Sequence, residues 1–210
     1  MADTDQAPAD HQAPAPRLLT LRADDFDAAC AALMRLVERD YAPSLLVGVR
    51  TGGMVVAEAM ARAAAIAPSV LPLTCRRQGT SVKSRIPGLR TILTALPQPL
   101  VDALRQTEHR LLSGRRRRAR PAEADLAEAT AIGEWLAGMP PQRVLVADDA
   151  VDSGVTLAAV LQALRQVCPS GTELRTAVIT VTLQDPVVAP DYALHRGVLC
   201  RFPWSFDAAA

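Results

Sequence analysis

The chain has 210 residues, half of them hydrophobic, so it can bury a core as one domain or at most two small ones. Its formal net charge of +1 is too balanced for a protein that coats nucleic acid by charge alone, and aromatic residues, at 3%, are too few to stack on single-stranded bases. No apolar run approaches the roughly 20 residues that cross a bilayer, and the N-terminus is not patterned like a signal peptide.

Residues 1–16 are rich in Ala, Pro, Asp and Gln without apolar periodicity, which predicts a disordered tail before one domain over 17–210. Asp24 and Asp25 offer an N-cap for the first helix. Hydrophobic periodicity and short apolar runs then predict a helix over 26–39, a strand over 44–49, a helix over 54–66 and a strand over 70–75.

Residues 76–120 are too long for a simple connection, and we expect a mobile loop followed by a helical insertion. The later elements are a helix over 122–136, a strand over 144–147, a helix over 157–167, and strands over 176–181 and 198–202. Alternating strands and helices predict an α/β fold, with a parallel core sheet flanked by helices and a small hood from the C-terminal segment.

Asp148 and Asp149 directly follow the apolar strand 144–147, and a helix begins shortly after Gly154. Ligands of an open α/β sheet bind at the carboxyl ends of its strands. Backbone N–H groups at the start of the helix favour a phosphate. Two adjacent carboxylates suit vicinal hydroxyl groups or Mg²⁺. The alternative is an acidic loop that merely caps the helix.

This pattern of an apolar strand, two acids, two small or apolar residues and Asp-Ser-Gly-Val-Thr resembles the PRPP-binding motif of type I phosphoribosyltransferases. The resemblance implies that Asp148 and Asp149 contact the ribose hydroxyls and hold Mg²⁺, directly or through water. It implies a proton-transfer role for Asp152. The 5-phosphate would be held by Asp152, Ser153, Gly154, Val155 and Thr156.

A second segment, Val47 to Gly53, resembles the pyrophosphate loop of the same family. Glycines let backbone amides approach an anion closely, and an arginine can reach its oxygens. The residues assigned to pyrophosphate are Arg50, Thr51, Gly52 and Gly53. The family's catalytic loop would lie over 76–85, where Lys83, the one lysine of the chain, joins Arg50 in neutralising pyrophosphate as it departs. The alternative is a solvated basic loop.

The C-terminal segment resembles the tail of xanthine and guanine phosphoribosyltransferases through Pro190-Asp191-Tyr192 and Phe202-Pro203-Trp204. Leu199 and Trp204 are the candidates for the base pocket, although Trp204 also suits core packing. Leu199 stands where some purine enzymes place an aromatic ring. Leu183 to Pro186 occupies the place of their lysine for the 6-oxo group, which argues against a 6-oxopurine acceptor.

We therefore expect a cytoplasmic, Mg²⁺-dependent enzyme that transfers the 5-phosphoribosyl group of PRPP to a nitrogen of a nucleobase-like acceptor. Its partners would be PRPP, a small-molecule acceptor and further copies of itself, with neither membrane nor nucleic acid. The four cysteines are spaced as free thiols. The alternative is a PRPP-sensing regulator or RNA-binding module, because Arg115 to Arg118 forms a basic run that suits either a solvated face or an acidic partner.

Overall fold

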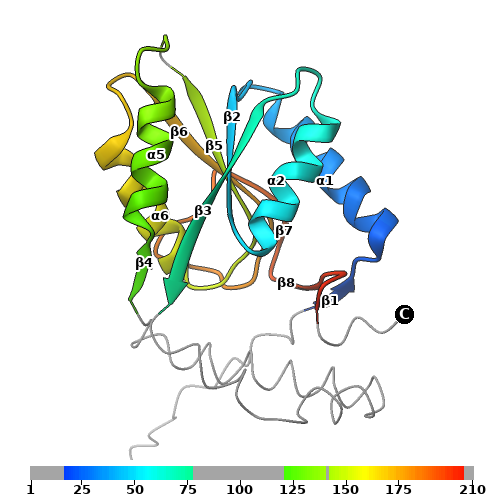
Figure 1. Cartoon of the computed structure of the whole chain (residues 1–210). Coiled ribbons are helices and arrows are strands. Elements are labelled where there is room, and N and C mark those ends of the chain that lie inside the picture. Colours follow the sequence, from blue (N-terminus) through cyan, green and yellow to red (C-terminus); the bar gives the residue numbers. More distant parts are fainter. Residues whose placement is uncertain (1–16, 78–120, 141, 206–210) are drawn as a thin grey trace, which may run out of the picture.

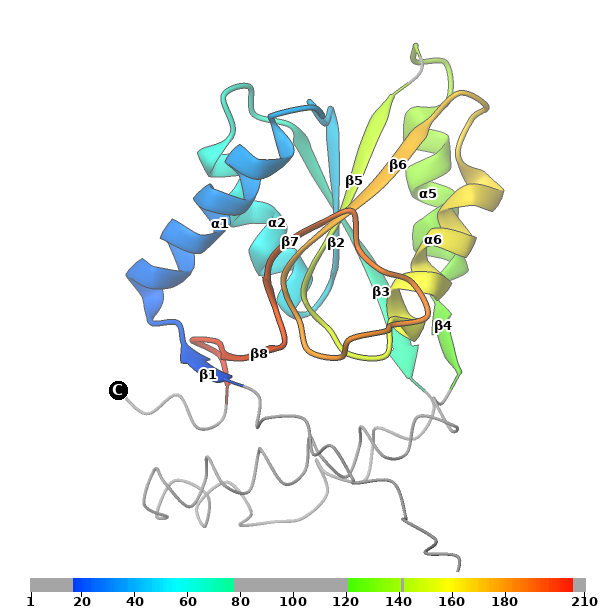
Figure 2. The ribbon, with the colours of Figure 1, turned by 180° about the vertical axis from the view of Figure 1, so that it is seen from behind.

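The computed structural model describes residues 17–77, 121–140 and 142–205. The predicted tail and residues 78–120 of the predicted loop and insertion, which include Lys83 and the basic run at 115–118, lie outside the described residues. A central sheet lies between two helical layers (Figure 1). One layer consists of α1 (Ala23–Val37) and α2 (Gly52–Ala63), and the other of α5 (Leu126–Leu136) and α6 (Val155–Val167). Figure 2 shows the same three layers from behind.

Six strands form the central sheet in the order β4-β3-β2-β5-β6-β7. All neighbouring pairs are parallel except β3 and β4, so the predicted α/β fold with a mostly parallel sheet is confirmed. The strands are β2 (Leu45–Arg50), β3 (Ser69–Arg77), β4 (Ala122–Ala124), β5 (Arg143–Val151), β6 (Glu173–Val181) and β7 (Tyr192–Arg196).

The centre of the sheet is apolar on both faces, as a strand covered by helices on two sides requires. Successive residues Leu45, Leu46 and Val47 of β2 are all buried, and they alternate between two hydrophobic clusters. Leu46 belongs to the cluster under α1 and α2. Leu45 and Val47 belong to the cluster under α5 and α6. This rigid platform fixes where the strands end, and therefore where a site can form.

Several predicted boundaries differ from the structure. β5 runs to Val151 instead of ending at residue 147, because its ladder with β6 continues through the acidic residues. Residues 122–124 form β4, which pairs with the end of β3, where the sequence predicted helix. Helix α1 starts at Ala23, which places Asp24 and Asp25 in its first turn and not at its N-cap.

Neither the strand over 17–20 nor β7 was predicted, whereas the strand predicted over 198–202 is present and ends one residue earlier. β1 (Arg17–Thr20) was absent from the prediction, and β8 (Val198–Arg201) pairs with β1 in a separate two-stranded sheet. This small sheet lies at the same end of the molecule as the carboxyl ends of the central strands (Figures 1 and 2). Leu199 pairs with Leu18 there.

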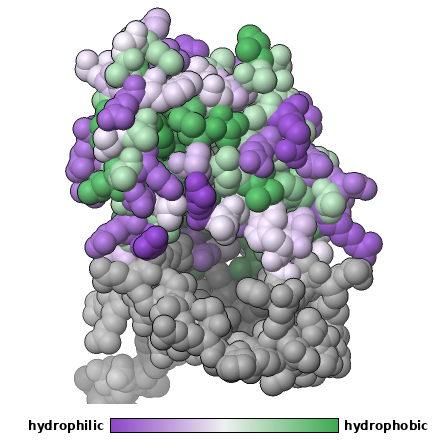
Figure 3. All heavy atoms as spheres, viewed as in Figure 1, coloured by the Kyte–Doolittle hydropathy of each residue, from purple (hydrophilic) through white to green (hydrophobic). Residues whose placement is uncertain are grey.

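The face of Figure 1 is mixed in character, with hydrophobic residues gathered between the two helical layers and hydrophilic residues over the helices (Figure 3). On this side β3 pairs with β4 only over Cys75–Arg77, so the earlier part of β3 is a sheet edge. Pro72 lies in that part and has no N–H to offer another strand, a common protection of edges. Among the described residues no helix is long and apolar enough to cross a membrane.

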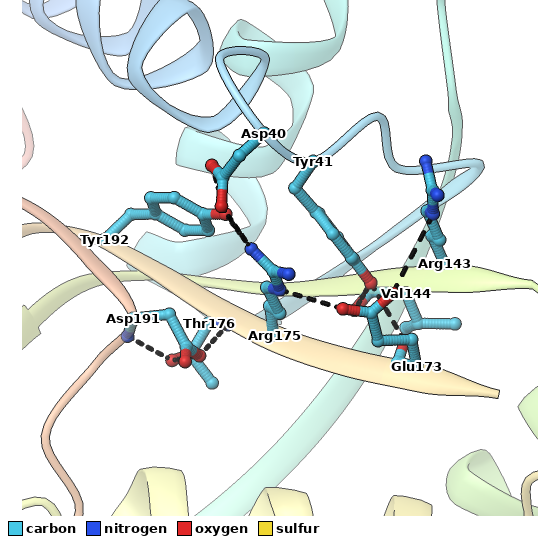
Figure 4. A network of polar contacts seen from close by, with 9 residues as sticks. All are labelled: Asp40, Tyr41, Arg143, Val144, Glu173, Arg175, Thr176, Asp191 and Tyr192. Atoms are coloured by element: carbon cyan, nitrogen blue, oxygen red, sulfur yellow. Dashed lines mark hydrogen bonds and ion pairs between the residues drawn. The ribbon is translucent and has the colours of Figure 1, made fainter.

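A polar network closes the amino ends of the strands (Figure 4). The Tyr41 hydroxyl donates to the carbonyl of Glu173 at 2.9 Å, and burial raises the pKa of this phenol. The guanidinium of Arg175 lies 4.6 Å from the centroid of the Tyr41 ring and donates to Asp40 at 2.6 Å. Its hydrogen bond lowers the pKa of Asp40, to which Tyr192 also donates at 2.9 Å. These contacts join the segment after α1 to β6 and β7 at the end opposite the paired acids.

Candidate functional site

The candidate site is built where β2 and β5 end side by side. Parallel neighbours in the sheet end at the same edge, which brings the Gly-Gly turn after β2 against the acidic residues of β5. A Cβ added to Gly52 would lie 2.1 Å from Oδ2 of Asp149. One added to Gly53 would lie 2.5 Å from the carbonyl oxygen of Ala147 and 2.9 Å from Oδ1 of Asp148. The two segments therefore touch, and glycine is required for that approach.

Asp148 and Asp149 are partly withdrawn from solvent, with Asp148 9% exposed. Local backbone amides orient both carboxylates. The N–H of Asp149 donates to Oδ1 of Asp148 at 3.0 Å, and the N–H of Ala150 donates to Oδ1 of Asp149 at 2.8 Å. Burial raises the pKa of Asp149, while hydrogen bonds, including one with Trp204, act in the opposite direction. A buried carboxylate of this kind is suited to a cation or to hydroxyl donors.

The turn that follows β5 has the form of an anion site. Gly154 is the N-cap of α6 and has φ of 76°, a conformation that glycine adopts at little cost. Val155 and Thr156 occupy the first turn of the helix, and Thr156 is buried. With Ser153 they place backbone N–H groups at the positive end of the helix dipole. This geometry suits a phosphate group.

A segment after β6 holds this turn in place. The N–H of Val187 donates to the carbonyl of Ser153 at 2.8 Å. A Cβ on Gly154 would lie 2.8 Å from both N and O of Val188. The N–H of Thr182 donates to the carbonyl of Val151 at 2.9 Å, and its hydroxyl donates to Oδ1 of Asp152. Residues 182–188 and the phosphate turn therefore form one connected unit.

Arg50 lies at the end of β2 and is half exposed, and its peptide bond with Thr51 is cis. Its Nη2 lies 3.6 Å from Oε1 of Glu128, on α5. Glu128 is itself fixed by Thr74, whose N–H donates to Oε2 at 2.6 Å and whose hydroxyl contacts Oε1 at 3.2 Å. The guanidinium is thus restrained beside the Gly-Gly turn, where it can reach an anion.

Trp204 packs into an aromatic cluster next to the paired acids. Its ring stacks on Phe202 with centroids 5.1 Å apart and meets Phe26 edge to face, also at 5.1 Å. The side chain is 39% exposed and interacts with Asp149. Trp204 therefore contacts Phe26 and Phe202 while part of its ring stays exposed, and its assignment to the base pocket stays a prediction. Leu199 is half-buried in β8, and no contact with an acceptor tests it.

Two residues of the site were missed in the sequence. Thr182 follows the apolar strand β6 directly, and β6 lies beside β5, which carries the acids. A polar residue at that strand end is a signal that the sequence does contain. Glu128 follows Asp125 by three residues, which is the pattern of a helix N-terminus, and Asp125 does cap α5. That pattern accounts for Glu128 by helix capping and gives no indication of its partner Arg50.

Comparison with known proteins identifies the family to which this chain belongs. The model of the phosphoribosyl transferase domain matches residues 22–195. A comparison with curated protein sequences finds no match. Among solved structures, the purine phosphoribosyltransferase from Pyrococcus horikoshii is 18% identical with a TM-score of 0.55, covering 90% of this chain and 94% of that one.

Two further solved structures share the fold. A Helicobacter pylori xanthine-guanine-hypoxanthine phosphoribosyltransferase is 17% identical with a TM-score of 0.55, covering 91% of this chain and 95% of that one. A hypothetical protein from Neisseria gonorrhoeae with bound ppGpp is 14% identical with a TM-score of 0.58, covering 90% and 89%. At these identities the likeness concerns the fold.

Proposed function

Because this chain belongs to the phosphoribosyltransferase family of enzymes, we propose that it transfers the 5-phosphoribosyl group of PRPP to a nitrogen atom of a nucleobase-like acceptor and releases pyrophosphate. The observation that carries the proposal is the contact of Gly52 and Gly53 with Asp149 and Asp148. It joins a candidate pyrophosphate site to a candidate ribose site, and the turn at Gly154 adjoins them. PRPP carries a phosphate, a ribose and a pyrophosphate in that order.

Each part of PRPP has residues suited to it. The backbone N–H groups of residues 153–156 and the hydroxyls of Ser153 and Thr156 would hold the 5-phosphate. Asp148 and Asp149 would accept hydrogen bonds from the ribose hydroxyls. Arg50 and the amides of the Gly-Gly turn would hold pyrophosphate. These contacts position the reacting carbon and stabilise the charge that develops on the leaving group.

The paired carboxylates also fit Mg²⁺. This ion is commonly held by one or two carboxylates together with substrate oxygens. Asp148 and Asp149 would hold the ion together with oxygens of PRPP. In the described parts of the chain, no three His, Cys, Asp or Glu side chains form a ligand cluster. When bound, Mg²⁺ would neutralise charge on the pyrophosphate oxygens.

In the proposed reaction the bond between C1 of the ribose and the pyrophosphate oxygen breaks, and its electron pair leaves with pyrophosphate. The acceptor nitrogen forms the new bond to C1 with inversion. The proton of that nitrogen passes to the carboxylate of Asp152, which sits at the start of the phosphate turn. A transition state of oxocarbenium character requires exclusion of water, a role that the proposal gives to residues 76–85, with Lys83 beside pyrophosphate. We also propose a cytoplasmic homo-oligomer.

A PRPP-sensing regulator is the second candidate. A solved structure of the same fold contains bound ppGpp, a nucleotide with two pyrophosphate groups, so this architecture also accommodates a nucleotide without need of an acceptor. This alternative includes an RNA-binding role, for which the basic run at 115–118 is the candidate. Such a regulator would bind PRPP or another nucleotide and would not release pyrophosphate from PRPP.

Asp152→Asn tests the proposal because the change is nearly isosteric and leaves the backbone phosphate contacts in place. Pyrophosphate release from PRPP, Mg²⁺ and a panel of bases should fall by about 10²–10⁴, the usual worth of a general acid–base group. PRPP affinity should change by a few-fold at most. If the parent protein releases no pyrophosphate with any base while binding PRPP, the enzyme assignment fails and the regulator stands. If the variant turns over at the parental rate, Asp152 merely shapes the loop.

A further inference from the structure

Thr182 is placed to control the carboxylate of Asp152. It directly follows β6, at the carboxyl end of the strand beside β5, and is 7% exposed. Its hydroxyl donates to Oδ1 of Asp152 at 2.5 Å and lies 3.4 Å from the carbonyl oxygen of Val151. The shorter contact is the hydrogen bond, because a hydroxyl has one proton to give.

The direction of this hydroxyl is fixed by the backbone. The N–H of Thr182 donates to the carbonyl of Val151 at 2.9 Å, which ties the residue to the segment that carries Asp152. A β-branched side chain has few rotamers, and burial reduces them further. The second tie, from Val187 to Ser153, holds the following part of the segment against the same turn. Thr182 is therefore a rigid donor.

A carboxylate held through Oδ1 has Oδ2 left for the acceptor. A general base is effective when its accepting atom is fixed within hydrogen-bond distance of the proton it removes. Without the hydroxyl, rotation about the terminal bond of Asp152 would spread both oxygens over many positions, since that torsion is broad in aspartate. The loss would affect the chemical step and leave the phosphate contacts intact.

We propose that Thr182 is a positioning residue of the transfer reaction, which acts by holding the Asp152 carboxylate so that Oδ2 receives the proton of the acceptor nitrogen. The inference rests on the proposed function. It concerns a side chain outside both sequence motifs, from the segment that packs against the phosphate turn. The segment that directly follows it, Leu183 to Pro186, is the one that the resemblance places where purine enzymes have their lysine.

The test compares Thr182→Val and Thr182→Ser in the parent and in Asp152→Asn. Loss of a hydrogen bond to a charged group should lower kcat by roughly tenfold or more. The KM and binding affinity for PRPP should stay within about twofold, since phosphate contacts are backbone contacts. Thr182→Ser should recover most of the lost kcat. In the Asp152→Asn background, Thr182→Val should have no further effect, because its action passes through the carboxylate.

Thr176→Val is the matched control. Thr176 lies on the same strand, is 1% exposed, and its hydroxyl donates to Asp191 at 2.7 Å at the far end of the sheet (Figure 4). It should lower thermal stability and leave kcat unchanged. A parental kcat in Thr182→Val would overturn the inference, as would equal losses in the parent and Asp152→Asn backgrounds. A parent without turnover refutes the proposed function and this inference with it, which separates the two kinds of failure.

Discussion

Gly52→Ala and Gly53→Ala are adjacent substitutions that should separate ligand binding from folding. The new Cβ at Gly52 would meet Oδ2 of Asp149 at 2.1 Å, and its neighbouring atom Cγ at 2.6 Å. A side chain can move away, so the carboxylate should turn by about 1 Å or more to reach an ordinary contact of 3.4 Å. Gly52 is the first residue of α2, so the higher helix propensity of alanine adds little there. Stability should therefore change little.

At Gly53 the obstacles are backbone atoms of β5, the carbonyl oxygen of Ala147 at 2.5 Å and Cα of Asp148 at 2.8 Å. They cannot turn away, so we expect a loss of about 1–3 kcal/mol, the usual cost of overpacking. By contrast, displacement of Asp149 in Gly52→Ala should weaken PRPP binding at least about tenfold, since a charge-assisted hydrogen bond is worth about 1.5–3 kcal/mol.

Denaturant unfolding and calorimetric PRPP titration measure the two effects on the same samples. Gly138→Ala is the control, because nothing lies within 4 Å of its Cβ and its cost comes from φ of 79° alone. It should lose stability and keep PRPP affinity. Two results would refute the idea that the ribose site depends on the contact between the Gly-Gly turn and the paired acids. One is a Gly52→Ala variant that binds PRPP as tightly as the parent. The other is an equal loss of stability in Gly52→Ala and Gly53→Ala.

Three further results are expected. Asp148→Asn combined with Asp149→Asn should weaken PRPP binding at least about tenfold by calorimetry, through lost charge-assisted bonds, and unchanged affinity would remove the ribose assignment. Burial raises the pKa of Asp149 above its unfolded value, so this group favours folding below the unfolded pKa and loses that effect as pH rises through the folded one. Asp149→Asn alone should therefore raise the melting temperature of the ligand-free protein at pH 7, with a gain that fades below about pH 4; an equal gain at both pH values would contradict the cause. Gly154→Ala should lower the free energy of unfolding by at least about 1–2 kcal/mol, because residue 154 has a left-handed conformation. It should also weaken the binding of inorganic phosphate. An unchanged melting temperature together with unchanged phosphate affinity would disprove this prediction.

Local sequence order accounts for the parts of the fold that were predicted. The segments 44–53 and 144–156 each contain an apolar run and a turn with glycine that leads into a helix, and both turns lie as expected at the carboxyl ends of neighbouring strands. Extended strand at Asp148 was not predictable in this way. Its pairing with Val178 comes from β6, and acidic side chains have low strand propensity by themselves.

Contacts between distant segments account for what was missed. Glu128 reaches Thr74 across 54 positions, and Thr182 reaches Asp152 across 30. Neither pair leaves a periodic pattern in the sequence, because both depend on which strands become neighbours. Residues 122–124 have helix-favouring composition and still form β4, since the backbone of β3 provides hydrogen bonds there. Tertiary pairing overrode local propensity at that point.

The proposed proton transfer to Asp152 constrains the choice of acceptor. In the proposed reaction Asp152, with one oxygen engaged by Thr182, would assist an acceptor that brings an N–H, and it would offer nothing to a ring nitrogen without a proton, such as that of a pyridine carboxylate. Residues 182–190 contain no Lys or Arg, so this segment has no cation for a 6-oxo group. The first acceptor panel should therefore contrast N–H heterocycles with pyridine carboxylates, and 6-amino with 6-oxo purines. Turnover with the pyridine carboxylates alone would show that the nitrogen needs no base and would remove the role given to Asp152.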